Sequence, residues 1–161
     1  MYPRIAEPAD FENITALINL AFQVERFFID GDRITAGAVR ELAAQGQFLV
    51  MEDSGGLAGC IYVESRGERG YLGLLSVDPS RQRSGLGSQL VLGAEEHCRS
   101  AGCRFVDLRI VNLREELPAF YRRLGYRENG TAAFTPGIAT KRPCHFIEMS
   151  KALDRTAEAA V

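Results

Sequence analysis

Residues 74–90 carry the sequence LLSVDPSRQRSGLGSQL, in which an apolar strand pattern runs into a turn and then into a helix. The helix starts within Gly85-Leu86-Gly87, and the first turn of a helix leaves backbone N–H groups unpaired at the positive end of the helix dipole. Glycine lacks the Cβ atom that would keep an anion at a distance. The stretch therefore predicts a site for phosphate or pyrophosphate, with Arg81 and Arg83 adding positive charge at its rim.

Three sequence patterns of phosphate-binding loops can be compared with this stretch. A Walker loop requires Gly-Lys before Ser or Thr, and Gly-Lys occurs nowhere in the chain. A dinucleotide fingerprint requires G-x-G-x-x-G, but Leu90 stands at its third glycine. Asp107 lies at the offset that this fingerprint expects, yet the preceding strand follows two glycine-turn hairpins rather than opening a βαβ half. The third pattern, Q-x-x-G-x-G, is filled completely by residues 82–87.

On both sides of the turn, the spacing of apolar residues changes between the helical and the strand period, as in a mixed fold of helices and strands. Helical spacing covers residues 11–22 and 35–45, with Asp10 and Thr35 as candidate caps. Three apolar runs joined by short glycine turns follow and predict an antiparallel meander ending at 71–77. Helix 84–100 is long enough for a parallel crossover to a strand over 105–111. Beyond it we expect a helix over 116–124, a strand from Tyr126, a loop over 130–143 and a last strand over 144–149.

A second motif supports the third pattern. Residues 116–126 carry the sequence ELPAFYRRLGY, and one helix and one strand separate them from Gly87. Together with Q-x-x-G-x-G, this segment resembles the GCN5-related N-acetyltransferases (GNATs) over residues 71–130, whereas residues 1–70 agree in element order only. The resemblance implies an α/β (α+β) fold: a single GNAT-like domain over 1–153 with a mostly antiparallel mixed sheet of six to seven strands, about four flanking helices and a splayed parallel strand pair. Residues 154–161 are expected to be a frayed tail.

The resemblance implies acetyl-CoA as cosubstrate and no metal. Backbone groups of the strand before the turn would contact the pantetheine arm, and the glycine turn would hold the pyrophosphate. The expected contacts are Leu75, Ser76, Val77, Gln82, Arg83, Ser84, Gly85, Leu86, Gly87 and Ser88, with Asn112, Ala119 and Tyr121 from the later segment. Asn112 departs from the family pattern, because it lies nine residues before Tyr121 instead of about seven.

In the family, acetyl transfer to an amine proceeds directly through a tetrahedral intermediate. Tyr121 occupies the position from which a family tyrosine protonates the departing CoA thiolate, so we expect it to be the catalytic acid. A backbone N–H near Val77 is the expected oxyanion donor. Many relatives carry a glutamate on the strand before the turn, and Tyr71-Leu72-Gly73-Leu74-Leu75 offers none. The base stays open, with Glu64, Glu115, Glu116 and His145 as candidates beside water-relayed deprotonation.

Composition narrows the function classes further. The chain has 161 residues and a net charge of −2, which matches nucleic acid poorly, and no apolar run approaches the roughly 20 residues of a membrane span. The N-terminus lacks the pattern of a signal peptide, and the four cysteines form no C-x-x-C pair. We therefore expect a cytoplasmic protein without a nucleic-acid or membrane partner, with the homodimer as one alternative for its assembly.

These observations favour an acetyl-CoA-dependent N-acetyltransferase acting on a primary amine. The alternative is a non-catalytic CoA-binding module of the same fold, a sensor or regulatory partner, which the missing strand glutamate favours. Asp30 and Asp32 suit a cationic acceptor, whereas Lys141 and Arg142 suit a carboxylate-bearing one. The sequence leaves a small molecule, a peptide N-terminus and a lysine open. An open groove or a closed pocket at the 27–33 and 130–143 loops would distinguish them.

Overall fold

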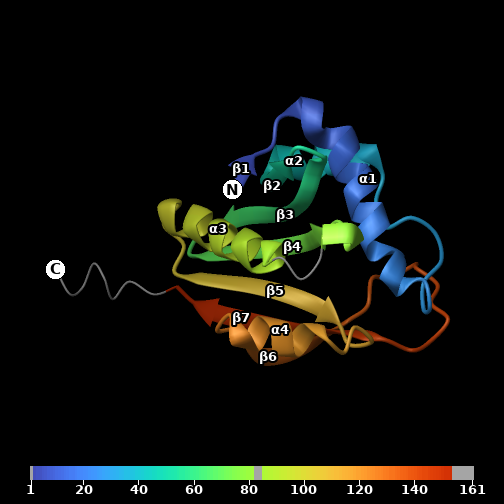
Figure 1. Ribbon diagram of the computed structural model, residues 1–161. Helices are drawn as coiled ribbons and strands as arrows, with labels where there is room; N and C mark the ends of the chain where they lie inside the picture. Colours follow the sequence, from blue (N-terminus) through green and yellow to red (C-terminus); the bar gives the residue numbers. More distant parts are fainter. Residues whose placement is uncertain (1, 82–84, 154–161) are drawn as a thin grey trace.

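One mixed sheet with a single parallel pair organises the protein. The computed structural model describes residues 2–81 and 85–153, and within them seven strands follow the spatial order β1-β2-β3-β4-β5-β7-β6 (Figure 1). Only β4 and β5 run parallel, and every other neighbouring pair is antiparallel. The strands are β1 (Arg4–Ile5), β2 (Gln47–Asp53), β3 (Gly56–Arg66), β4 (Arg69–Val77), β5 (Phe105–Val111), β6 (Arg127–Ala133) and β7 (His145–Ala152).

Helices cover the two faces of the sheet unequally. On one face, α3 (Leu86–Ser100) and α4 (Leu117–Arg123) pack on a core that spans β2 to β7 (Figure 1). On the other face, α1 (Phe11–Ala21) and α2 (Ala36–Gln45) pack on a second core that involves only β2, β3 and β4. The second face of β5, β7 and β6 therefore carries no described helix. Three short 3-10 turns, η1 (Pro8–Asp10), η2 (Phe22–Glu25) and η3 (Pro79–Arg81), join these elements.

The expected fold is confirmed in its element order and in its parallel pair. Thr35 caps α2 as predicted, since its Oγ1 accepts a hydrogen bond from Ala38 N at 3.1 Å. Asp10 precedes α1, but the prediction that its side chain caps the helix is wrong. That carboxylate binds Arg4 at 2.9 and 3.0 Å and accepts from the Glu7 N–H at 2.7 Å, because the charged donor of β1 lies within reach.

Two boundaries at the end of the chain also differ from the expectation. Strand β6 continues to Ala133, so the loop before β7 is shorter than predicted, and β7 lasts until Ala152. β7 inserts between β5 and β6, pairing with β5 from Phe105 to Val111 and with β6 from Arg127 to Ala133. The two ladders with β7 extend both strands. The expected tail at 154–161 lies outside the described residues.

A buried polar contact fixes α3 against the second half of the sheet. Glu95 on α3 is only 2% exposed, and its carboxylate accepts hydrogen bonds from the Tyr126 hydroxyl and from Lys151 Nζ, each at 2.9 Å. Both partners satisfy a charge that would be costly to bury alone. The contact therefore joins the helix that follows the glycine turn to Tyr126, just before β6, and to Lys151, within β7.

Candidate active site

The parallel strands β4 and β5 separate after the first three residues of each strand. Their ladder has three pairs, Arg69 with Phe105, Gly70 with Val106 and Tyr71 with Asp107. Arg69 donates to both carboxylate oxygens of Asp107 at 2.7 and 2.6 Å, which fastens the closed end. The remaining part of β4 has no ladder partner on β5. The backbone edge of β4 is thus open to a ligand where the strands diverge.

A β-bulge distorts β4 at this opening. Ser76 pairs with Cys60 and Gly73 pairs with Tyr62, so two residues of β4, Leu74 and Leu75, oppose one residue of β3. Leu74 has a φ of +55°, the one positive φ at a non-glycine residue in the described structure. Such strain in a branched residue is typical of functional backbone. A bulge leaves backbone groups outside the ladder, and here they lie beside the opening between the strands.

A cleft of about 1320 Å³ passes through the divergent strands. Phe22 and Glu25, from the α1 side of the sheet, line it together with Leu117 and Tyr121, from the α4 side. The residues of the bulge, Leu74 and Leu75, lie between them. The cleft therefore joins the two faces of the sheet at the bulge, which is the arrangement needed for two substrates to meet from opposite sides.

The glycine turn leads into the start of α3. Gly85 adopts a left-handed conformation with a φ of +79°, and among residues 2–81 and 85–153 no side-chain hydrogen bond caps the N–H groups that follow it. Leu86 is buried in the core and anchors the helix, whereas Gly87 faces the α4 residue Phe120. The N–H groups of Leu86, Gly87 and Ser88 are thus suited to a pyrophosphate. The predicted contacts Gln82, Arg83 and Ser84 lie outside the described residues.

Tyr121 lies at the junction between the turn and the cleft. The residue is 7% exposed, lines the cleft, and packs edge-on against Phe120 and Tyr126 with ring centroids 4.9 and 5.7 Å away. Burial raises the pKa of the Tyr121 phenol, and the positive charge of Arg114 opposes that shift. The phenol therefore stays protonated throughout the physiological range, as a proton donor must.

The other predicted contacts are distributed between the cleft and its surroundings. Leu75 lines the cleft, whereas Ser76 is 1% exposed and donates to the Leu74 carbonyl at 3.0 Å. Val77 pairs with Gly59 on β3, so the bulge at Leu74 and Leu75 is a better place for an oxyanion donor than Val77. Ala119 is exposed on α4.

Asn112 and Arg81 have structural partners. The amide oxygen of Asn112 accepts from the His145 N–H at 2.8 Å, at the start of β7, and the residue does not line the described cleft. Arg81 was expected at the rim of the phosphate site. Its guanidinium binds Asp53 at 2.8 Å and Asp78 at 3.0 Å, and so joins the β2–β3 turn to the β4–α3 turn. Two carboxylates within reach explain this orientation.

Two buried carboxylates line the cleft among the described residues. Glu64, one of the predicted candidates, accepts from the Tyr62 hydroxyl at 2.9 Å and pairs with Arg66. Burial alone would raise the pKa of Glu64, but the hydrogen bonds from Arg66 and Tyr62 outweigh it and the pKa is lowered. Of the other candidates, Glu115, Glu116 and His145 are exposed and do not line the cleft.

Glu25 is the second of these carboxylates, and sequence reasoning missed it. The residue is 8% exposed and binds Arg114 Nη1 at 3.0 Å. Burial raises its pKa despite the attraction of Arg114. No motif marks Glu25, because its partner lies 89 residues away in the sequence. The helical spacing that ends near Phe22 signals only that a loop follows.

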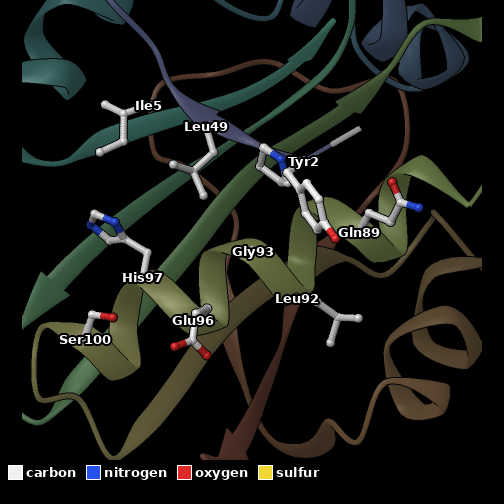
Figure 2. Close-up of a pocket in the computed structure, with 10 residues that line it drawn as sticks. Tyr2, Ile5, Leu49, Gln89, Leu92, Gly93, Glu96, His97 and Ser100 are labelled. Carbon is white, nitrogen blue, oxygen red and sulfur yellow. The ribbon is translucent and has the colours of Figure 1, made fainter.

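A second hollow of about 740 Å³ lies apart from this cleft (Figure 2). Tyr2 and Ile5, from the N-terminal segment, face Leu92, Gly93 and His97 on α3. None of its lining residues belongs to β4, β5 or α4. It is therefore separate from the divergent strands and from Tyr121.

The remaining structural observations concern metals and membranes. Within residues 2–81 and 85–153, no group of three or more His, Cys, Asp or Glu side chains is placed to hold a metal ion. None of the helices described there is both long and apolar enough to cross a membrane.

An opened parallel pair, a bulged strand and a helix that follows a glycine turn define an acyltransferase-type architecture. A family model described as "Acetyltransferase (GNAT) domain" matches residues 44–128. The match covers more than half of the chain, so the protein belongs to the GNAT acetyltransferase family. The resemblance deduced from the two motifs is thereby confirmed.

Solved structures share the whole fold at low sequence identity. The ribosomal-protein-alanine N-acetyltransferase of Brucella melitensis is 19% identical, with a TM-score of 0.78 over 95% of this chain and 100% of that one. The protein yncA of Salmonella typhimurium, solved with its cofactor acetyl-CoA, is 20% identical, with a TM-score of 0.76 over 95% and 94%. An aminoglycoside 6'-N-acetyltransferase complexed with coenzyme A is 22% identical, with a TM-score of 0.76 over 96% and 98%. No sequence among the curated proteins matches the chain.

Proposed function

We propose that the protein is an acetyl-CoA-dependent N-acetyltransferase that transfers the acetyl group directly to a primary amine. The observation that carries this function is the cleft through the divergent strands, which brings the bulge of β4 and the buried Tyr121 to one place. Family membership and relatives solved with acetyl-CoA or coenzyme A agree with it. Acetyl-CoA would supply an activated thioester.

Different residues of the chain bind the cofactor, stabilise the oxyanion and donate the proton. The N–H groups of Leu86, Gly87 and Ser88 hold the pyrophosphate, and the open edge of β4 holds the pantetheine arm. Backbone donors at Leu74 and Leu75 meet the negative charge that develops on the acyl oxygen. As the C–N bond forms and the C–S bond breaks, Tyr121 donates its proton to the sulfur.

Glu25 is our candidate for the base that accepts the proton of the incoming ammonium group. Of the two buried carboxylates in the cleft, Glu25 has the raised pKa and Glu64 the lowered one. A base works best when its pKa lies near the working pH, which favours Glu25. Arg114 contacts Glu25 directly and acts electrostatically on Tyr121, so it links the base to the acid.

Replacing Glu25 by Gln is expected to lower kcat/KM by about 100-fold at neutral pH, with the Kd of acetyl-CoA unchanged. The base must be ionised, so wild-type activity should fall as the pH drops through the raised pKa of Glu25. The variant should lose this acidic limb in a kcat/KM profile. Glu116→Gln is the matched control, because Glu116 also contacts Arg114 but is exposed. An unchanged limb in Glu25→Gln would contradict the role.

The function is tested by thiol release from acetyl-CoA against a broad panel of amines. We expect amine-dependent release of CoA together with the N-acetylated product by mass spectrometry. Saturable acetyl-CoA binding without transfer to any amine would instead establish the non-catalytic CoA-binding module. Stabilisation by ATP or NAD but not by CoA would overturn both functions, because a ligand raises the melting temperature of the fold that binds it.

A further inference from the structure

Two loops meet across one end of the acceptor side of the cleft. The segment between η2 and α2 contacts the segment between β6 and β7 through a backbone hydrogen bond from Lys141 N to Phe28 O at 2.7 Å. Lys141 Nζ also donates to Arg26 O at 3.2 Å and pairs with Asp30 at 2.9 Å. The Arg142 guanidinium lies over the Phe27 ring at 5.4 Å. We call these contacts between residues 26–30 and 141–142 the loop clasp.

The loop clasp converts this part of the cleft into a pocket. Ile29 and Ile34 line the cleft from the first loop, and Phe134 and Ile138 line it from the second. Because the two loops are joined by backbone and side-chain contacts, a polypeptide cannot pass between them without breaking the clasp. The acceptor site therefore suits a free molecule rather than a lysine within a folded protein.

The clasp also neutralises the acidic residues that the sequence offered for a cationic acceptor. Asp30 is paired with Lys141, and Asp32 lies 3.5 Å from Arg26. Deeper in the cleft, Glu25, Glu64 and Asp107 are each paired with an arginine. Most of the negative charge along the described cleft is thus already matched.

Of the arginines that line the described cleft, Arg33 and Arg109 have no ion pair there, and Arg33 lies over the Phe22 ring at 5.4 Å, next to the loop before α2. Arg66, Arg69 and Arg114 are each paired with a carboxylate. Arg109 is exposed on β5, and its guanidinium carbon lies over the Phe146 ring, 4.4 Å from the centroid. Phe146 in turn stacks on Phe134, with centroids 5.1 Å apart and an interplanar angle of 30°.

The contact with Phe146 holds the Arg109 guanidinium beside the cleft without using a carboxylate partner in the described structure. Stacking uses the face of the guanidinium and leaves the N–H donors on its edge available for a planar anion. The whole group lies on the face of β5 and β7 that no described helix covers. Glu148 is the register partner of Arg109 on β7, yet no ion pair joins them in the described structure. Arg109 is therefore placed to bind an anionic group of the acceptor.

We infer that the acceptor is a free amine of low molecular mass that carries a carboxylate, and that Arg109 binds this carboxylate. The inference rests on the proposed N-acetyltransferase function and names the class of its second substrate. The amine of the acceptor points toward the bulge of β4. Its carboxylate contacts Arg109, which packs on Phe146 and, through it, on Phe134. Arg109 is then a specificity-determining residue that takes no part in the chemistry.

The test compares amino acids of increasing amine-to-carboxylate separation, each paired with its own carboxamide. Wild-type protein should prefer the carboxylate over the carboxamide by roughly 10–100-fold in kcat/KM, the range of a charged hydrogen-bonded pair. Arg109→Gln should abolish this preference by raising KM for the carboxylate, with kcat and the Kd of acetyl-CoA little changed. Arg127→Gln is the matched control, because Arg127 is exposed at the start of β6 and does not line the cleft.

A second variant is expected to change KM for the carboxylate in the opposite direction. Glu148→Gln removes the negative charge opposite Arg109 and should lower KM for the carboxylate a few-fold. A wild-type preference for carboxamides or diamines, with a loss in Glu148→Gln instead, would overturn the inference. So would efficient acetylation of lysines in a folded protein. In each of these cases acetyl transfer itself is observed, so the proposed function stands while the acceptor class fails.

Failure of the proposed N-acetyltransferase function gives a different experimental result. If acetyl-CoA binds but no amine of any class is acetylated, the proposed function fails and the acceptor class falls with it. Calorimetry of the protein with bound CoA tests the role of Arg109 separately, without turnover: the carboxylates should bind to the wild type and should not bind to Arg109→Gln. Equal binding to the variant overturns the assignment of Arg109.

Discussion

Replacing Tyr121 by Phe is expected to lower kcat by about 10²–10⁴-fold while the Kd of acetyl-CoA stays nearly unchanged. The substitution removes the phenolic proton and keeps the ring, so the edge-on contacts with Phe120 and Tyr126 survive. Burial raises the pKa of Tyr121, and the proton is therefore present at every pH used for the assay. Stopped-flow or steady-state thiol release, together with calorimetric titration of acetyl-CoA, measures both quantities.

The matched control is Tyr126→Phe, which removes a hydroxyl from the neighbouring ring. That hydroxyl donates to Glu95 at 2.9 Å and contacts no residue of the proposed mechanism. We expect this variant to lose about 1–2 kcal/mol of unfolding free energy, since it takes one hydrogen bond from a buried carboxylate, and to retain its kcat. Wild-type turnover in Tyr121→Phe would eliminate Tyr121 as the acid.

Replacing Gly87 by Asp is expected to weaken acetyl-CoA binding by about 100-fold or more without unfolding the protein. A carboxylate in the first turn of α3 competes for the N–H groups there and repels the pyrophosphate, and like charges in contact cost several kcal/mol. The fold has room for it, because a Cβ at Gly87 would meet Phe120 no closer than 3.4 Å. Calorimetry should show the loss of binding, while the melting temperature of the free protein stays constant or rises slightly.

Gly37→Asp is a close control for that experiment. Gly37 is the second residue of α2, as Gly87 is the second residue of α3. A Cβ there would meet only Thr35 Oγ1, at 3.8 Å. The control carries the same charge at the same position of a helix and should bind acetyl-CoA as the wild type does. Equal affinities in the two variants would mean that the pyrophosphate lies elsewhere.

Local signals in the sequence were sufficient for most of the fold. The glycines at the ends of elements and the changes in the spacing of apolar residues predicted the order of helices and strands. Both signals depend on residues that are close together in the chain. The two GNAT-like segments identified the family, since the glycine turn and the helix with Tyr121 are short and contiguous. The prediction of Thr35 as a cap was correct for the same reason, whereas the prediction of Asp10 was wrong, because Arg4 of β1 competes for its carboxylate.

The site was predicted in part. Gly85, Leu86, Gly87 and Tyr121 are where the motifs place them, although their roles remain proposals. The expectation that Arg81 lies at the rim of the phosphate site stays a prediction, and its ion pairs with Asp53 and Asp78 could not be read from the sequence, which shows a charge without its partners. Glu25 was missed because its importance lies in burial and in Arg114, and neither is visible in the residues that surround it.

The sequence by itself determined the family, the element order and the position of the glycine turn before α3, because a glycine turn and an amphipathic period act over a few residues. Only the tertiary structure decided how the cleft is formed and enclosed. The strand β7 enters between β5 and β6, β4 and β5 separate after three pairs, and Lys141 reaches Phe28 across the cleft. The strand pairs join residues 12 to 47 positions apart, and the contact between Lys141 and Phe28 joins residues 113 positions apart. Their pairing therefore depends on the complete packing of the chain.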